Sequence, residues 1–264
     1  MEDSTHLAHT EALSDLHPHS KPERNQCSKD AVKNGLEVAC LMCKEMPKQT
    51  GKRHFCGKTC AEKADKDAPI LLGIPKNDPE FADIVKRFTD TWQGSNKLTV
   101  HRIYGFVNSK AVENGFQAYQ TNVEKAGKWI SQGRLPETRN LGGMEPFENV
   151  PSGMIQTSLT SAPATVPWFG KIFEGICAKG IYTSAYSSTS HDYPLFATKG
   201  LPYRAILLTR VVMGKEYISV LGTTDPNAKA PPAGYHSVAV GMDHSEFVVF
   251  QSEAICPSWL VLYS

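Results

Sequence analysis

The segment that fixes the fold class of this 264-residue chain is Arg204-Ala-Ile-Leu-Leu-Thr-Arg-Val-Val-Met-Gly214. Its aliphatic and β-branched residues end at a glycine, which is typical of a β-strand followed by a turn. Three further apolar runs follow, at residues 236–240, 246–250 and 259–263. Because these runs lie close together and no helical pattern separates them, they predict an antiparallel sheet.

Helical and extended patterns alternate upstream of these strands. Residues 68–75 are expected to be extended, and the capping sequence Asn-Asp-Pro-Glu at 77–80 predicts that a helix begins there. The large apolar residues that share one face of this helix are Phe81, Ile84, Val85, Phe88 and Trp92. A strand is expected over residues 98–108, then a helix of about 18 residues, and then a loop over residues 131–168. Helices that precede a run of strands indicate the α+β class.

The composition excludes several classes of protein. The chain is 41% apolar, which excludes wholesale disorder. Its 28 basic and 27 acidic residues give a net charge of +1, too small an excess to bind nucleic acid or anionic lipid over the whole surface. No apolar run suits a membrane-spanning helix, and residues 1–15 lack the layout of a secretory signal. We therefore expect an intracellular protein of the nucleus or cytoplasm, with no membrane partner and a disordered tail over residues 1–35.

Four cysteines form two closely spaced pairs, Cys40-Leu-Met-Cys43 and Cys56-Gly-Lys-Thr-Cys60. Four thiolates suit a structural zinc ion, and zinc would stabilise a segment too small to have a core of its own. We expect this zinc knuckle to span residues 36–66, with His54 able to replace one thiolate. The alternative is four unpaired thiols in a flexible arm. The basic residues near the cysteines are expected to be a solvated face rather than a nucleic-acid site.

A second motif is Gly180-Ile-Tyr-Thr-Ser-Ala-Tyr-Ser-Ser-Thr-Ser-His-Asp-Tyr193, in which hydroxyl residues lie between aromatic ones directly after a glycine. The pattern predicts a turn into a short strand, with Ser or Thr capping the element that follows. The aromatic rings can stack on a planar ligand whose carboxamide binds a hydroxyl group, or they can fill a core.

This motif resembles the NAD-binding stretch of poly(ADP-ribose) polymerase catalytic domains, in which a Gly-aliphatic-Tyr step is followed at fixed spacing by two Ser and a Tyr. The blocks that extend the resemblance, in order, are residues 204–215, 231–238, 245–250 and 255–263. Residues 100–104, the helix near Tyr119 and the cysteine-rich segment are similar to fungal relatives that join a zinc knuckle to this domain. The resemblance covers about residues 40–264.

The resemblance implies an α+β, ADP-ribosyltransferase-like fold over residues 67–264, with antiparallel sheets and flanking helices. It implies a glycosyltransferase that moves ADP-ribose from NAD to an acceptor and releases nicotinamide. Mono-transfer is favoured over polymer formation, and a protein acceptor over nucleic acid.

The same resemblance implies roles for individual residues. The Tyr193 ring would stack on nicotinamide, Ser190 would bind its amide, and Tyr182 would form the second aromatic wall beside the catalytic carboxylate of Glu246. Gly180 and Ser188 complete the NAD-binding set. A carboxylate suits this place because cleavage of the bond between ribose and nicotinamide gives an oxocarbenium-like centre, whose positive charge it stabilises.

One feature of the family is missing. The family has a His-Gly-Thr or His-Gly-Ser step that contacts the adenosine ribose and the nicotinamide amide, whereas residues 134–143 read Arg-Leu-Pro-Glu-Thr-Arg-Asn-Leu-Gly-Gly. One lost neutral hydrogen bond lowers donor affinity by up to roughly tenfold. The missing step leaves one alternative open, a catalytically inactive module that binds NAD or ADP-ribose. A further alternative is a zinc-dependent nucleic-acid or protein adaptor whose large domain is only a scaffold.

Overall fold

The computed structural model describes residues 21–49, 54–127, 152–155, 180–192, 203–219, 228–240 and 246–264. The chain divides into two compact units, Met1–Gly57 and Lys58–Ser264. The division falls inside the predicted knuckle, because helix α2 (Lys58–Asp67) groups with the second unit. Within the described parts of the chain, no helix is long and apolar enough to span a membrane.

The first unit contains a helix that the sequence analysis did not predict. Helix α1 spans Lys21–Lys33, so the expectation of a disordered tail over residues 1–35 is wrong for this part; residues 1–20 lie outside the described residues. The helix has no apolar face to signal it. Gly35 caps the C-terminal end of the helix, with a φ of 71° in the left-handed region. The Leu36 N–H donates a hydrogen bond to the Ala31 carbonyl of the last turn.

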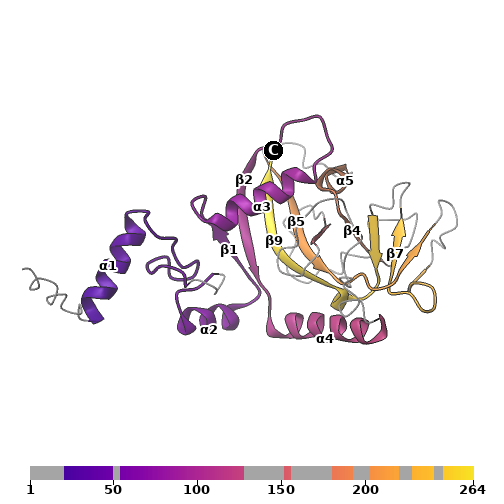
Figure 1. Ribbon diagram of the computed structural model, residues 1–264, viewed down its shortest axis with the longest axis horizontal. Helices are drawn as coiled ribbons and strands as arrows, with labels where there is room; N and C mark the ends of the chain where they lie inside the picture. The colour runs from indigo at the N-terminus through magenta and orange to yellow at the C-terminus, as the bar shows by residue number, and fades with distance from the viewer. Residues whose placement is uncertain are drawn as a thin grey trace, which may run out of the picture. The chain divides into compact units, whose positions relative to one another are not determined.

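The second unit is built on one nine-stranded sheet (Figure 1). Each neighbouring pair is antiparallel except β7 and β6, which are parallel. The described chain is therefore a mixed α+β protein, as predicted, and its sheet is antiparallel except at this one edge pair. In spatial order the strands are β1 (Ile70–Ile74), β2 (Val100–Val107), β9 (Ile255–Tyr263), β5 (Arg204–Val211), β3 (Ser152–Ile155), β4 (Ile181–Ser184), β8 (Glu246–Val249), β7 (Ser237–Val240) and β6 (Glu216–Ile218).

Helix α3 (Pro79–Asp90) confirms the predicted capping sequence. The Asp78 side chain accepts a hydrogen bond from the Glu80 N–H at 3.0 Å, and Pro79 begins the helix. The buried face of α3 packs on the sheet, where the Phe88 ring lies 4.9 Å from that of Tyr263 on β9. At the start of the helix, the Trp259 indole N–H donates to the Glu80 carboxylate at 2.9 Å.

Helix α4 (Lys110–Gly127) has the 18 residues that the apolar spacing predicted. Its buried Phe116 and Val123 pack with Val212 and Cys256. Tyr119 of the same helix packs against a cluster that includes Phe247 of β8. Helix α4 therefore covers the face of the sheet on which Phe247 lies.

Three strands differ from the prediction. Strand β3 lies inside residues 131–168, which were expected to be loop, and β6 was not predicted. Strand β9 begins at Ile255, earlier than the apolar run at 259–263, and it contains Pro257. A proline is tolerated there because the ladder between β5 and β9 shifts register between Leu208 and Thr209.

Candidate functional site

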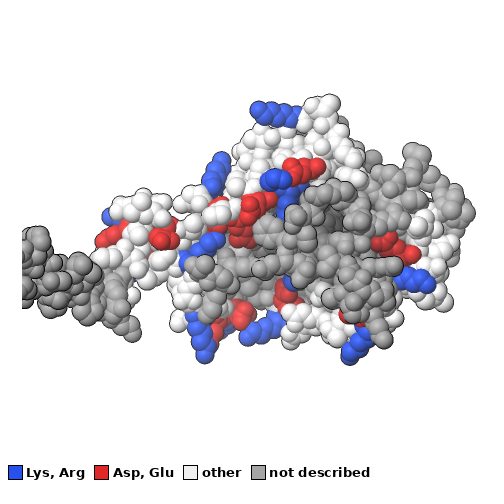
Figure 2. Space-filling view, viewed as in Figure 1, with Lys and Arg blue, Asp and Glu red and all other residues white. Residues whose placement is uncertain are grey.

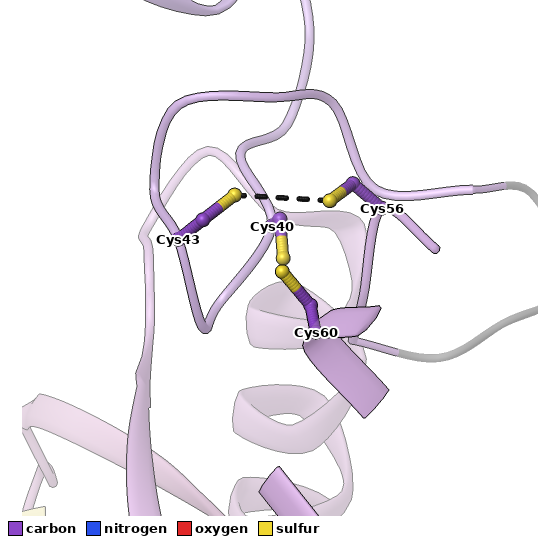
Figure 3. Close-up of side chains that lie close together, drawn as sticks. All are labelled: Cys40, Cys43, Cys56 and Cys60. Carbon is purple, nitrogen blue, oxygen red and sulfur yellow. Dashed lines mark hydrogen bonds between the residues drawn. The ribbon is translucent and has the colours of Figure 1, made fainter. Parts of the chain in front are cut away.

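The four predicted zinc ligands lie together (Figure 3). The sulfur atoms of Cys40, Cys43, Cys56 and Cys60 are all within 4.8 Å of one another. The Cys43 and Cys56 sulfurs are 3.7 Å apart. With Zn–S bonds of about 2.3 Å, a tetrahedral site has S···S edges of about 3.8 Å. The spacing and the soft thiolate ligands fit a structural zinc ion, and His54 is not part of this group.

The backbone around Cys40 and Cys43 folds into a tight loop. The Cys40 N–H donates to the Met46 carbonyl at 2.7 Å, and the Lys44 N–H donates to the Cys40 carbonyl at 2.8 Å. Lys44 has a φ of 60°, which allows the chain to reverse directly after Cys43.

This loop also favours a thiolate at Cys43. Partial burial alone would raise the pKa of Cys43, but hydrogen bonds from the backbone N–H groups of Glu45 and Met46, and from the thiols of Cys40 and Cys56, lower that pKa to about 7. Metal ligands must be deprotonated, so the fold favours the form of Cys43 that binds a metal.

The second candidate site lies where β4 and β8 pair. Tyr182 is opposite Val248, and Ser184 is opposite Glu246. Residues directly opposite each other on antiparallel strands share a face, so these four side chains lie on one face of the sheet. Tyr182 and Glu246 are diagonal neighbours on it, at about 7–8 Å. We call this the Glu246 face, and it is opposite the face that carries Phe247.

Tyr182 is half-buried on the Glu246 face, where it packs against the buried side chains of Val238, Val240 and Val248. Glu246 is half-buried at the start of β8, opposite Val240 of β7. The carboxylate therefore lies at the end of an apolar patch, with an aromatic ring one strand away.

Gly180 is buried directly before β4. A β-carbon at this position would lie 2.0 Å from Cγ1 of Val248, so no other residue fits without displacing the Val248 side chain. The resemblance assigns Gly180 to NAD binding. The structure gives it a packing role, which brings β4 close enough to β8 to align Tyr182 with Glu246.

Helix α5 (Ser187–Asp192) follows β4 and carries two of the predicted NAD-binding serines. It is attached to the end of α3 by Ser187, whose hydroxyl donates to the Phe88 carbonyl at 2.7 Å. The Ser188 hydroxyl accepts a hydrogen bond from the Gln93 N–H at 3.2 Å. Ser190 is buried. Ser188 is thus engaged in holding the segment after α3.

His191 lies at the centre of a cluster that the sequence analysis missed. Its Nδ1 is 2.9 Å from the Tyr263 hydroxyl, and a guanidinium nitrogen of Arg204 is 2.7 Å from its Nε2. Its ring also packs against Trp92 at 4.8 Å. These partners come from β9, β5 and the end of α3, so only their position in the fold could have identified them. They fix the end of α5 directly after Ser190.

The structure brings together only some of the predicted site residues. It brings Tyr182 and Glu246 onto one face and places Ser188 and Ser190 on the next element. Tyr193 and residues 134–143 lie outside the described residues. No model of a protein family matches the chain, and no curated protein matches its sequence.

Proposed function

We propose that the second unit is an NAD-dependent ADP-ribosyltransferase with an ADP-ribosyltransferase-like fold, preceded by a zinc-binding knuckle. The observation that carries the proposal is the register of β4 and β8. This register puts the Tyr182 ring and the Glu246 carboxylate on the same face. The resemblance assigned these two residues to one NAD site although 64 positions separate them in the sequence.

The chemistry follows from the residue types. The nicotinamide leaves with the electron pair of the bond between its nitrogen and ribose C1′, and positive charge develops on the ribose. The Glu246 carboxylate would accept hydrogen bonds from the ribose hydroxyls and stabilise that charge. The acceptor oxygen then forms the new bond to C1′, and its proton passes to the carboxylate or to water.

Tyr182 and Ser190 would hold the leaving group. The Tyr182 ring offers a flat apolar surface for nicotinamide, and the Ser190 hydroxyl offers a hydrogen bond for its carboxamide. Because Ser187 and His191 attach α5 to three other elements, the Ser190 backbone is positioned before any ligand arrives.

The test is release of nicotinamide from NAD by the full chain, with and without Glu246→Gln. This change keeps the shape of the side chain and removes its charge, so we expect a loss of about 10²–10³-fold in rate. The control is Glu253→Gln, which removes an exposed carboxylate from the short helix Ser252–Ala254 and should leave the rate unchanged.

Two results would count against the proposal. Full activity in Glu246→Gln would contradict the role of the carboxylate. Calorimetric binding of NAD by the unaltered chain, without any release of nicotinamide, would support the inactive binding module that the missing His-Gly step suggests.

A further inference from the structure

Two aromatic rings and a lysine form a cluster at the far end of the Glu246 face. The Lys215 ammonium lies 4.6 Å from the centre of the Tyr235 ring, and the Tyr235 ring meets that of Tyr217 edge-on at 5.3 Å. Tyr217 packs against Val238, Val240 and Val248, as Tyr182 does. Tyr217 therefore lies on the same face as Tyr182 and Glu246, and the cluster, which comprises Lys215, Tyr217 and Tyr235, extends from it to the edge of the sheet.

The turn that carries this cluster is fixed by local contacts. Gly214 has a φ of 58°, and a β-carbon there would lie 2.7 Å from both His236 and Val123, so only glycine fits. The Lys215 N–H donates to His236 Nδ1 at 3.0 Å, and the His236 N–H donates to the Lys215 carbonyl at 2.8 Å. The cluster is therefore preorganised and need not be ordered by a ligand.

The order of the strands places the cluster opposite the leaving group. Helix α5 with Ser190 follows β4, and β8, β7 and β6 come next in the sheet. Glu246 on β8 thus lies between Ser190 and the cluster. If nicotinamide leaves on the Ser190 side, the acceptor approaches C1′ from the opposite side, which is the side of β7 and β6.

The distance between Lys215 and Glu246 across the sheet sets the number of peptide residues between the two contacts. Lys215 lies two residues before Tyr217, which pairs with Val238, and Glu246 pairs with Val240, so Lys215 and Glu246 are two strands and about four residues apart. Strand spacings of about 4.8 Å and a rise of about 3.3 Å per residue place their backbones about 16 Å apart. An extended peptide covers this distance with about four to five residues.

We propose that Lys215, Tyr217 and Tyr235 form an acceptor-recognition site, which binds a peptide carrying an acidic side chain four or five residues from the residue that receives ADP-ribose. This proposal rests on the proposed transferase function. The Lys215 ammonium would pair with the acidic side chain, and the two rings would contact the intervening peptide.

The charges favour a peptide over a nucleic acid. The site contributes a single lysine, whereas binding of a phosphate backbone takes several cations. Lys and Arg side chains alternate with Asp and Glu on the face drawn in Figure 2, so the part of the structure described there has no continuous basic surface. The neighbouring Glu216 lies one position before Tyr217 in β6, and its side chain therefore points to the opposite face.

The test compares two peptides that differ only at the position four or five residues from the modified residue, one with Glu there and the other with Lys. We expect the unaltered protein to modify the Glu peptide about three- to tenfold faster. Lys215→Glu should reverse this preference, and Lys215→Met should abolish it. Nicotinamide release without any peptide should stay unchanged in both variants, because water then replaces the acceptor.

The control is Lys63→Glu, the same change at an exposed position of α2, which should keep the preference of the unaltered protein. Equal rates with both peptides, together with normal nicotinamide release, would overturn the acceptor site alone. Absence of nicotinamide release in the unaltered protein would overturn both proposals. Faster transfer to a phosphorylated oligonucleotide than to either peptide would overturn the assignment to a peptide.

Discussion

Glu113 joins α4 to the sheet through an ion pair that is largely shielded from water. Its carboxylate oxygens lie 2.6 and 2.7 Å from one guanidinium nitrogen of Arg210, and the Asn108 amide donates to it at 3.0 Å. The Glu113 side chain is 31% exposed and that of Arg210 is 23% exposed. Partial burial alone would raise the pKa of Glu113, but the bonds from Arg210, Asn108 and Cys256 lower it.

The same network keeps the Cys256 thiol protonated. Its sulfur lies 2.9 Å from a guanidinium nitrogen of Arg210 and 3.4 Å from the Glu113 carboxylate. Burial is the main cause that raises the pKa of this thiol to about 12, and Glu113 adds to it, although Arg210 acts in the opposite direction. The thiolate is the reactive form of cysteine, so Cys256 has a structural role.

Replacement of Glu113 by Gln should therefore destabilise the second unit. The change leaves the Arg210 guanidinium shielded from water without a carboxylate to neutralise its charge. We therefore expect a loss of about 2 kcal/mol in the free energy of unfolding at pH 7, measured with urea. Because folding lowers the pKa of Glu113, its contribution is present above the pKa of the unfolded chain, about 4.3, and disappears as the pH falls through the folded value. The difference between the variant and the unaltered chain should therefore shrink at acid pH.

Glu62→Gln is the matched control, because its pair with Lys58 is exposed and contributes little. An equal loss of stability in both variants would contradict a special role for Glu113.

At the scale of elements, α5 depends on hydroxyl groups for its attachment. The buried Ser187 hydroxyl donates to the Phe88 carbonyl at 2.7 Å and lies 3.2 Å from the Thr91 hydroxyl. Ser187→Ala would leave both partners buried without this bond, which costs about 1–3 kcal/mol. We expect a lower melting temperature and, because α5 also carries Ser190, a higher KM for NAD in the nicotinamide-release assay.

Thr121→Ala provides the comparison for Ser187. Its hydroxyl makes a similar bond to a carbonyl, that of Gln117 at 2.8 Å, but on the exposed side of α4, where water can replace it. Should both variants melt at the same temperature, the attachment of α5 would not depend on Ser187.

The elements differ in how far the sequence alone could predict them. Helices α3 and α4 were predictable because caps and apolar spacing are local signals. Strand β3 has four residues, including Gly153, and β6 has three, so neither is long enough to show an alternating pattern. Helix α1 was missed because most of its residues are polar and its apolar residues form no stripe along one face.

The site was predictable in its residue types and not in its geometry. The alignment of Tyr182 with Glu246 depends on the register between β4 and β8, which the sequence does not encode locally. The bond from Gln93 to Ser188 joins residues 95 positions apart. The resemblance therefore assigned Ser188 to NAD, whereas its described partner is the segment after α3.

On the scale of the whole molecule, the zinc knuckle and the sheet depend on different sources of stability. Among the described residues of the first unit, which supplies three of the four cysteines, only Cys40 and Leu41 are buried apolar side chains, whereas the second unit, which supplies Cys60, buries apolar side chains on both faces of its sheet. A segment without a core depends on its metal for folding. Zinc should therefore stabilise the knuckle and contribute little to the sheet.

Removal of zinc with a chelator should expose this difference. All four tryptophans, at positions 92, 129, 168 and 259, lie outside the knuckle at residues 36–66, so their fluorescence reports on the part of the chain that follows it. We expect chelation to make the four knuckle thiols reactive towards a thiol reagent, while the tryptophan unfolding midpoint and nicotinamide release stay unchanged. Cys43→Ser should make the three remaining knuckle thiols reactive in the same way without a chelator. Cys27→Ser, which removes an exposed thiol of α1, should not. A fall in the tryptophan midpoint on chelation would contradict the independence of the knuckle and the sheet, because the metal would then also stabilise the sheet.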